Sequence, residues 1–364
     1  MTTGRRQWLW ALSLFCFLSA YLSVPVNAQQ EAAPPVQVVP YVEPPNHLDL
    51  CGEPVPLHVQ DVWERFDREF TILVYAHAQV YLWLKRAERF FPRFEEELKR
   101  RNLPLDLKYV AVAESDLQHG AYSPMGAAGL WQFIPGTGQR YGLATQGSVD
   151  ERYDFELATD SALRYLKDLY DQFQNWTLAI AAYNCGERRV QEEMERQKVR
   201  DYYQLKLPAE TERYIFRILA IKAILSSPEK YGYVLPKGAG YPEEAFDYVE
   251  ATVPYPVPIQ ALAEKAGITY REFKRLNPSF ISREIPRGQY RFRLPRGHGA
   301  RFRQNLASFL EAFKPKAVLH VVEKGDTLTR IAKRYGVSVS DLRRWNGLKG
   351  STIWLGQKLI VHRD

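Results

Sequence analysis

The stretch ESDLQHGAYSPMGAAGLWQFIPGTGQRYG, residues 114–142, sets the expected fold and chemistry of this chain. Its first residue, Glu114, ends a helical run of apolar residues. A glycine-rich segment follows and carries Ser123, Trp131 and Gln132. A single carboxylic acid beside such a segment is the content expected of a sugar-binding cleft, in which a few polar groups are set among apolar and aromatic side chains.

Apolar residues recur at helical spacing through most of the chain before residue 245. The spacing predicts helices near residues 61–101, 104–115, 160–173, 177–183 and 210–225, and strand signals are nearly absent. We therefore expect a mainly α domain over residues 59–237.

The C-terminal third contains an internal repeat. LAEKAGI at residues 262–268 matches IAKRYGV at 331–337, and FKRLN at 273–277 matches LRRWN at 342–346. Each copy has a β-like run, two short helical segments and a second β-like run, so each reads as a small α+β unit of the βααβ type.

The N-terminus has the features of a targeting signal. Arg5 and Arg6 precede an apolar run that ends at the small-residue site Val26-Asn27-Ala28, which predicts a cleaved signal peptide over residues 1–28. A retained membrane anchor stays open, because the run is just long enough to span a bilayer. Export would expose Cys51 and Cys185 to oxidation, so they form either a disulfide or two buried thiols.

The net charge of +7 is unevenly distributed. Residues 257–364 carry 22 Lys and Arg against 8 Asp and Glu, which suggests an anionic polymer as partner. Export argues against nucleic acid and favours a cell wall whose peptides bear carboxylates.

Cleavage of a glycosidic bond requires a carboxylic acid that is still protonated near neutral pH. Apolar neighbours and a helix C-terminus both favour a raised pKa for Glu114. A hydrolase also needs a second carboxylate. Asp116 is two residues away and points elsewhere on a helix, and Asp150, Glu151 and Asp154 offer no convincing alternative. One acid is enough if the substrate supplies its own nucleophile.

Three motifs carry a family resemblance: Glu114-Ser115, SPMGAAGLWQF at residues 123–133 and AYNCG at residues 182–186. On these motifs residues 59–235 resemble the catalytic domain of the membrane-bound lytic murein transglycosylase D group. The resemblance implies a lysozyme-like fold and non-hydrolytic cleavage of peptidoglycan. The C6 hydroxyl of N-acetylmuramic acid would attack C1 and leave a 1,6-anhydro end, with Glu114 as acid and then base.

The resemblance also implies roles for the residues around the acid. Ser123 would bond the acid or polarise the muramyl N-acetyl group, and Tyr183 would orient Glu114. The cleft would be lined by Gln132, Thr137, Glu210 and Tyr214. Without the motifs, Ser123 could be a turn residue, and Tyr183, Trp131 and Phe133 could be core. Cys185 and Glu212 depart from the family pattern.

Residues 318–363 resemble a LysM module, a binder of glycans containing N-acetylglucosamine. VVEKGDTL at 321–328 and LGQKL at 355–359 carry the resemblance, which implies glycan contacts by Gly325, Asp326, Thr327, Leu328, Asn346 and Leu348. Asp326 and Thr327 could instead cap a helix. The upstream copy, residues 247–297, has PVPI at 256–259 in place of GDTL, so we interpret it as a degenerate LysM-like unit.

These observations predict an exported peptidoglycan lytic transglycosylase of the periplasm or cell envelope, with linkers at residues 29–58 and 298–317. No cofactor is expected, nor a metal, since His119 has no second ligand at usable spacing. The alternatives are a hydrolytic muramidase and a non-catalytic peptidoglycan-binding scaffold.

Overall fold

The computed structural model describes residues 39–363 apart from residue 315, and it leaves the side chains of residues 146, 316, 362 and 363 undescribed. The chain divides into two units, residues 1–41 and 42–364. The predicted signal peptide, residues 1–28, lies outside the described residues. Within residues 39–363, none of the described helices combines the length and apolar character that a membrane span requires.

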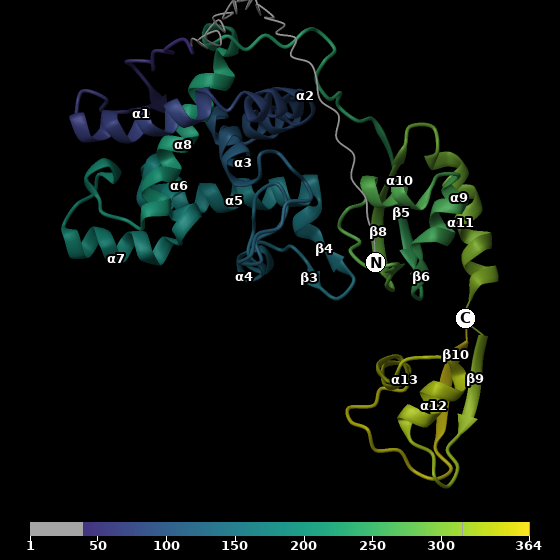
Figure 1. Ribbon diagram of the computed structural model, residues 1–364. Helices are drawn as coiled ribbons and strands as arrows, with labels where there is room; N and C mark the ends of the chain where they lie inside the picture. Colours follow the sequence, from purple (N-terminus) through teal and green to yellow (C-terminus); the bar gives the residue numbers. More distant parts are fainter. Residues whose placement is uncertain (1–38, 315, 364) are drawn as a thin grey trace, which may run out of the picture. The chain divides into compact units, whose positions relative to one another are not determined.

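The first part of the second unit is mainly helical (Figure 1). Its α-helices are α1 (Gln60–Val74), α2 (His77–Arg100), α3 (Lys108–Ser115), α4 (Pro135–Arg140), α5 (Phe155–Phe173), α6 (Trp176–Cys185), α7 (Glu187–Gln197) and α8 (Ala209–Ser226). The helical run predicted over 61–101 is two helices. The Tyr233 hydroxyl donates to the carbonyl of Val74 at 2.6 Å, and so takes an acceptor that a continuing helix would use.

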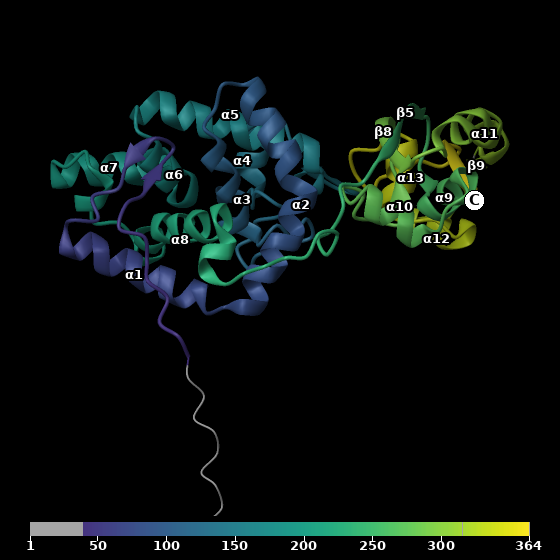
Figure 2. The ribbon, with the colours of Figure 1, turned by 90° about the horizontal axis from the view of Figure 1, so that it is seen from above.

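One hydrophobic core joins these helices. Helix α8 packs against α1, α3 and α6, and Figures 1 and 2 show α1 and α8 side by side although they are far apart in the sequence. The largest fully buried side chains include Trp83, Trp131, Phe66 and Phe216. The acid-bearing helix α3 is therefore held by helices from both ends of the domain.

The prediction of a linker over residues 29–58 is wrong for its described part. Strands β1 (Asp49–Leu50) and β2 (Glu53–Pro54) form a hairpin, and Leu50 is fully buried in the helical core. The Glu53 carboxylate accepts hydrogen bonds from the backbone N–H groups of Trp176 and Thr177 at 2.6 and 3.1 Å. The segment thus caps the N-terminus of α6.

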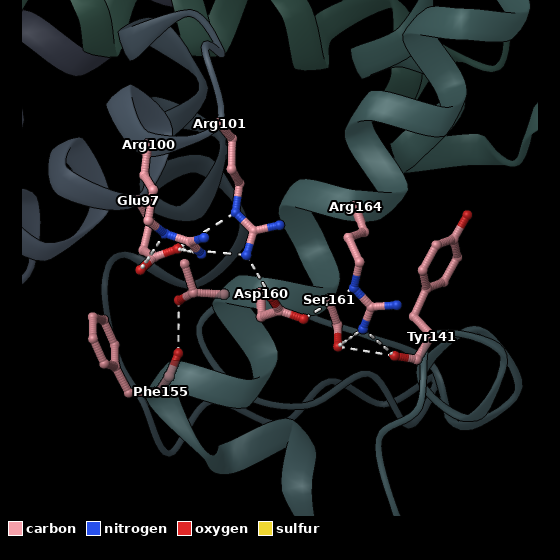
Figure 3. Close-up of polar contacts among 9 residues, drawn as sticks. Glu97, Arg100, Arg101, Tyr141, Phe155, Asp160, Ser161 and Arg164 are labelled. Carbon is pink, nitrogen blue, oxygen red and sulfur yellow. Dashed lines mark hydrogen bonds and ion pairs between the residues drawn. The ribbon is translucent and has the colours of Figure 1, made fainter.

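A polar network joins the end of α2 to α5 and α4 (Figure 3). Asp160 of α5 forms ion pairs with Arg101, the C-cap of α2, and with Arg164. Arg164 and Ser161 donate to the carbonyl of Tyr141, the C-cap of α4, at 2.6 and 3.1 Å. These bonds hold Tyr141, near the end of the stretch 114–142, against α5.

The C-terminal third contains the two predicted βααβ units. The first has β5 (Phe246–Val253), α9 (Ile259–Ala266), α10 (Tyr270–Leu276) and β8 (Gly288–Pro295), with a two-residue pair β6 (Val257–Pro258) and β7 (Glu284–Ile285). The second has β9 (Lys316–Val321), α12 (Leu328–Tyr335), α13 (Val339–Trp345) and β10 (Lys358–Arg363). In each unit the outer strands pair antiparallel, and each has its own core. A mainly α domain followed by small α+β modules is confirmed.

The predicted linker over residues 298–317 is wrong. Helix α11 (Gly299–Phe313) occupies most of it, and Phe302 and Leu306 pack into the core of the first module. Asp247 explains where the helix begins, because its carboxylate accepts from the backbone N–H groups of Gly297 and Gly299, both at 2.8 Å.

Candidate active site

Glu114 lies at the last turn of the short helix α3. Val110, Ala111 and Val112 are fully buried, and Asp116 ends the helix in the left-handed conformation at φ 55°. The helix is therefore anchored in the core by its apolar residues, while the Glu114 side chain stays partly exposed beside the glycine-rich segment.

The Glu114 carboxyl has a pKa raised to about 7. Burial is the main cause, because it disfavours the charged form. A hydrogen bond from the Tyr214 hydroxyl to Glu114 Oε1 and the positive charge of Arg217 lower the pKa in part, and the negative charge of Glu210 raises it. At neutral pH a substantial fraction of this carboxyl is still protonated, as a general acid requires.

Helix α8 supplies the three side chains that act on this carboxyl. Glu210, Tyr214 and Arg217 follow at helical spacing, so they share one face. Tyr214 is buried, whereas Glu210 is exposed in the first turn of the helix. The hydroxyl that donates to the Glu114 carboxyl belongs to Tyr214. The predicted role of Tyr183 in orienting the acid stays a prediction.

Tyr183 and Ser115 hold the glycine-rich segment. The Tyr183 hydroxyl donates to the carbonyl of Trp131 at 2.7 Å. Ser115, next to the acid in sequence, places its hydroxyl 2.8 Å from the carbonyl of Leu130. The segment is thus tied directly to the helix that bears Glu114. Ser115 belongs to the Glu114-Ser115 motif, but nothing in the sequence indicated that its side chain lies on the buried side of α3.

Ser123 and Gln132 shape the segment from within. Ser123 Oγ accepts from the backbone N–H of Ala127 at 3.0 Å. This is the contact expected of a turn residue. The Gln132 side-chain amide donates to the carbonyl of Gly129 at 2.8 Å, and its backbone has a φ of 47°. Thr137 lies in α4, half-buried. Trp131 and Phe133 are core residues, with 0% and 2% of their surface exposed.

Arg152 is the residue of this region that sequence reasoning missed. Its Nη1 donates to the carbonyls of Gly126 and Phe133 at 2.6 and 2.8 Å, and so joins two parts of the glycine-rich loop, residues 121–133, which is called the cleft loop below. Asp150 holds the guanidinium by bonds to Nε and Nη2 at 2.9 and 2.7 Å. A Cβ at Gly129 would lie 1.9 Å from the Arg152 carbonyl oxygen, so the loop packs directly on this backbone.

The other acidic side chains near the motif have structural partners. Asp116 accepts from the indole of Trp83 at 2.8 Å, and Asp150 pairs with Arg152. Glu151 accepts from the backbone N–H of Ala144 at 2.7 Å. Asp154 caps α5 by accepting from the N–H groups of Glu156 and Leu157.

In the second module several predicted glycan contacts have structural partners. Thr327 caps α12 through the N–H of Arg330 at 3.1 Å, and Asp326 accepts from the N–H of Glu323 at 2.9 Å. The amide of Asn346 bonds to backbone groups of Leu342 and Ile360.

Leu328 is 3% exposed in the module core, so the prediction that it offers an apolar surface is wrong. Gly325 is exposed and Leu348 is half-buried. Trp354 and Leu355, which sequence reasoning did not select, are 71% and 74% exposed.

Comparison with known proteins matches three segments to described families. Residues 92–206 match the transglycosylase SLT domain, residues 246–310 the LysM-like domain of lytic transglycosylase MltD, and residues 320–362 the LysM domain. The chain is 34% identical over 292 residues to the membrane-bound lytic murein transglycosylase D of Escherichia coli strain K12, across 76% of this chain and 64% of that protein. The chain thus combines an SLT domain with LysM-like and LysM domains and is similar to the membrane-bound lytic murein transglycosylase D proteins.

The chain spans just under two thirds of the length of the curated relatives it matches. Among solved structures, the 70 kDa soluble lytic transglycosylase of Escherichia coli is 24% identical with a TM-score of 0.35, over 47% of this chain and 30% of that one. The lytic transglycosylase Slt of Pseudomonas aeruginosa is also 24% identical, with a TM-score of 0.30 over 42% and 26%.

Two positions at which this chain departs from the expected pattern have local explanations. Glu212 forms an ion pair with Lys206 at 2.9 Å and accepts from the N–H of Leu207, so it anchors the loop before α8. Cys185 and Cys51 are free, half-buried thiols rather than a disulfide. Burial raises the pKa of both thiols.

Proposed function

We propose that this protein is a peptidoglycan lytic transglycosylase that cleaves the β-1,4 bond between N-acetylmuramic acid and N-acetylglucosamine without water. The observation that carries the proposal is Glu114, a carboxyl with a pKa of about 7 whose neighbour in the chain, Ser115, bonds to the glycine-rich loop. Its acidic neighbours in the motif are already engaged in structural bonds. Within the motif Glu114 is thus the acid available for proton transfer, and the substrate supplies the nucleophile.

The reaction balances with Glu114 alone. Protonated Glu114 gives its proton to the glycosidic oxygen as the bond from that oxygen to C1 of the muramyl residue breaks. The carboxylate then accepts the proton of the muramyl C6 hydroxyl as this oxygen bonds to C1. The products are a free hydroxyl on one fragment and a 1,6-anhydro end on the other, and Glu114 is protonated again.

The surrounding residues suit this cycle. Burial keeps Glu114 protonated for the first step, and the Tyr214 hydroxyl stabilises the carboxylate in the second. The loop that holds Ser123 and Gln132 would bind the sugar, since it is tied to α3 next to the acid.

A hydrolytic muramidase is the second candidate, and Glu210 is the observation that favours it. This exposed carboxylate is close enough to Glu114 to raise its pKa, so it could serve as the base that activates water. Mass spectrometry of digested peptidoglycan separates the two candidates. Anhydro ends support the transglycosylase, reducing ends support the muramidase, and no products support a binding protein.

Glu114→Gln tests the site assignment. The amide is nearly isosteric but carries no transferable proton, so cleavage should fall by at least roughly 10²–10⁴-fold while folding is retained. Glu210→Gln is the matched control, because it changes a neighbouring carboxylate in the same way and should leave anhydro products. Near-normal cleavage by purified Glu114→Gln protein would remove Glu114 from the mechanism.

The remaining assignments are proposals that rest on the same function. We propose that residues 1–28 direct export to the periplasm or cell envelope and that residues 318–363 bind glycan strands of peptidoglycan. Gly325, Asp326, Thr327, Asn346 and Leu348 remain candidates for that contact, because they are at least partly exposed.

A further inference from the structure

The first βααβ module, residues 246–295 with helix α11, is bonded to the catalytic domain through a β-hairpin. In that domain, strands β3 (Thr145–Gln146) and β4 (Val149–Asp150) form the hairpin. The N–H of Asp150 donates to the carbonyl of Ser279 at 2.8 Å, and the N–H of Ile281 donates to the carbonyl of Ser148 at 3.0 Å. Val149 and Phe280 form an antiparallel bridge. Residues 279–281 thus extend the hairpin by one more strand segment.

A buried ion pair reinforces this contact. Arg293 of β8 donates from Nη1 and Nη2 to the two carboxylate oxygens of Asp154, both at 2.8 Å. The two side chains are 9% and 12% exposed. Bidentate pairs of this geometry fix orientation as well as distance. Asp154 is also the N-cap of α5, so the module contacts the start of a main helix of the catalytic domain.

The polar contacts continue from the hairpin to the cleft. Asp150, whose N–H is bonded to the module, holds Arg152 with its carboxylate. Arg152 in turn donates to the carbonyls of Gly126 and Phe133 in the cleft loop. Ser115 bonds the same loop to the helix of Glu114. Hydrogen bonds and the backbone of the cleft loop therefore link Ser279 to Ser115, the residue that follows the acid.

We propose that the LysM-like module is a positioning element of the active site, which holds the glycine-rich loop in register with Glu114 through Asp154, Asp150 and Arg152. The inference rests on the proposed transglycosylase function for its kinetic consequence. The segment that would follow the second helix as a glycan-contacting loop in a LysM module is used here to pair with the hairpin. The module contacts the catalytic domain through residues 279–281 and through Arg293.

Two substitutions in the full chain break the ion pair from opposite sides. Arg293→Met removes the charge and the fork of donors. Asp154→Asn removes the charge but keeps the helix cap, because asparagine caps as well as aspartate. Arg287→Met is the matched control, since it removes the same charge from an exposed position of the same module.

Hydrogen exchange without substrate gives the first readout. We expect faster exchange at the N–H groups of Ala128 and Gly129, which bond within the cleft loop to Phe133 and Ala121, in both ion-pair variants and not in the control. Turnover of a soluble glycan fragment gives the second. We expect kcat to fall by about tenfold to a hundredfold, the range that a misplacement of about 1 Å can cause, with KM changed less.

Unchanged loop exchange or unchanged kcat in both ion-pair variants overturns the proposal. If either variant fails to fold, Ile281→Pro provides the test, because it removes one backbone donor to Ser148 and leaves both charges in place. If the wild-type protein produces no cleavage, the proposed function fails, whereas the exchange measurement still decides whether the module holds the loop.

Discussion

The two βααβ modules share one internal feature and differ in their sheet surfaces. In each, the side-chain amide of one asparagine bonds to both backbone groups of a residue on the last strand, an arrangement called the lock below. In the first, Asn277 donates to the carbonyl of Arg293 and accepts its N–H, both at 2.8 Å. In the second, Asn346 makes the same pair of bonds to Ile360 at 2.8 and 2.7 Å. This lock makes Arg293 and Ile360 equivalent positions, and their strand partners are Tyr248 and Leu319.

At these equivalent positions the chemistry differs. Arg293 is buried against Asp154, and Tyr248 donates to Glu156 of α5. Ile360 and Leu319 are 41% and 55% exposed. At these positions the sheet of the first module is polar and contacts the catalytic domain, whereas the sheet of the second module is apolar and exposed. We propose from this difference that the first module acts on the geometry of the cleft loop, whereas the second holds the enzyme on peptidoglycan.

Deletion of residues 318–364 is the largest test of this division. Retention on purified insoluble peptidoglycan should fall by about a hundredfold or more, because a bound module raises the effective concentration of further strands by 10²–10⁴-fold. Cleavage of short soluble glycan should stay within about twofold, since a tether does not help a substrate with one site. A pull-down and a soluble assay measure the two effects. Equal retention of the truncated protein would assign wall binding to another part of the chain.

The sequence predicted the helices, the repeat and Glu114, because these depend on periodicity and on local motifs. It could not predict which tyrosine contacts Glu114. Tyr183 and Tyr214 both stand in motifs, and only packing shows that α8 places Tyr214 against the acid. Leu328 was misjudged because a loop motif does not show which of its side chains enters the core. The docking by Arg293 was missed because it joins positions 139 residues apart.

The pH dependence of turnover should be independent of the second module. The first step needs protonated Glu114, and the pKa of about 7 means that this form is present below pH 7 and lost above it. Turnover of soluble glycan should therefore fall about tenfold per pH unit above roughly pH 8. Profiles from pH 5 to 9 should coincide for the full chain and for the chain without residues 318–364. An alkaline limb near the ordinary glutamate pKa would contradict the burial argument.

A matched pair of substitutions in the lock compares the modules directly. Asn277→Ala and Asn346→Ala each leave backbone groups of the outer strand without their side-chain partner, at a cost of about 1–3 kcal/mol in stability for buried groups. The cost should be larger at Asn277, which is 3% exposed, than at the half-buried Asn346. Exchange protection measured module by module gives both values.

Asn277→Ala and Asn346→Ala should have different functional consequences. Asn277→Ala should also lower turnover of soluble glycan, because it loosens the strand that carries Arg293. Asn346→Ala should weaken retention on peptidoglycan and leave soluble turnover unchanged. Equal effects of the two substitutions on soluble turnover would break the proposed division between geometry and attachment.

The smallest expected effects come from the cleft loop itself. Ser123→Ala and Tyr183→Phe each remove one hydrogen bond to a neutral backbone group of the loop. A neutral bond contributes about 0.5–1.5 kcal/mol, so kcat should fall by about 2- to 12-fold while substrate binding largely survives. The loop would be loosened from within, as the loss of Arg293 loosens it from outside.

Ser338→Ala is the control for this last pair, because it removes a comparable bond, the cap of α13 to the N–H of Asp341 at 3.0 Å, from the second module. It should leave kcat on soluble glycan unchanged. Combining Tyr183→Phe with Arg293→Met sharpens the comparison further. If both bonds hold the same loop, their effects on kcat should not add, since residues that share one network couple in double-mutant cycles. Strict additivity would show that the module and Tyr183 act on the acid by separate routes.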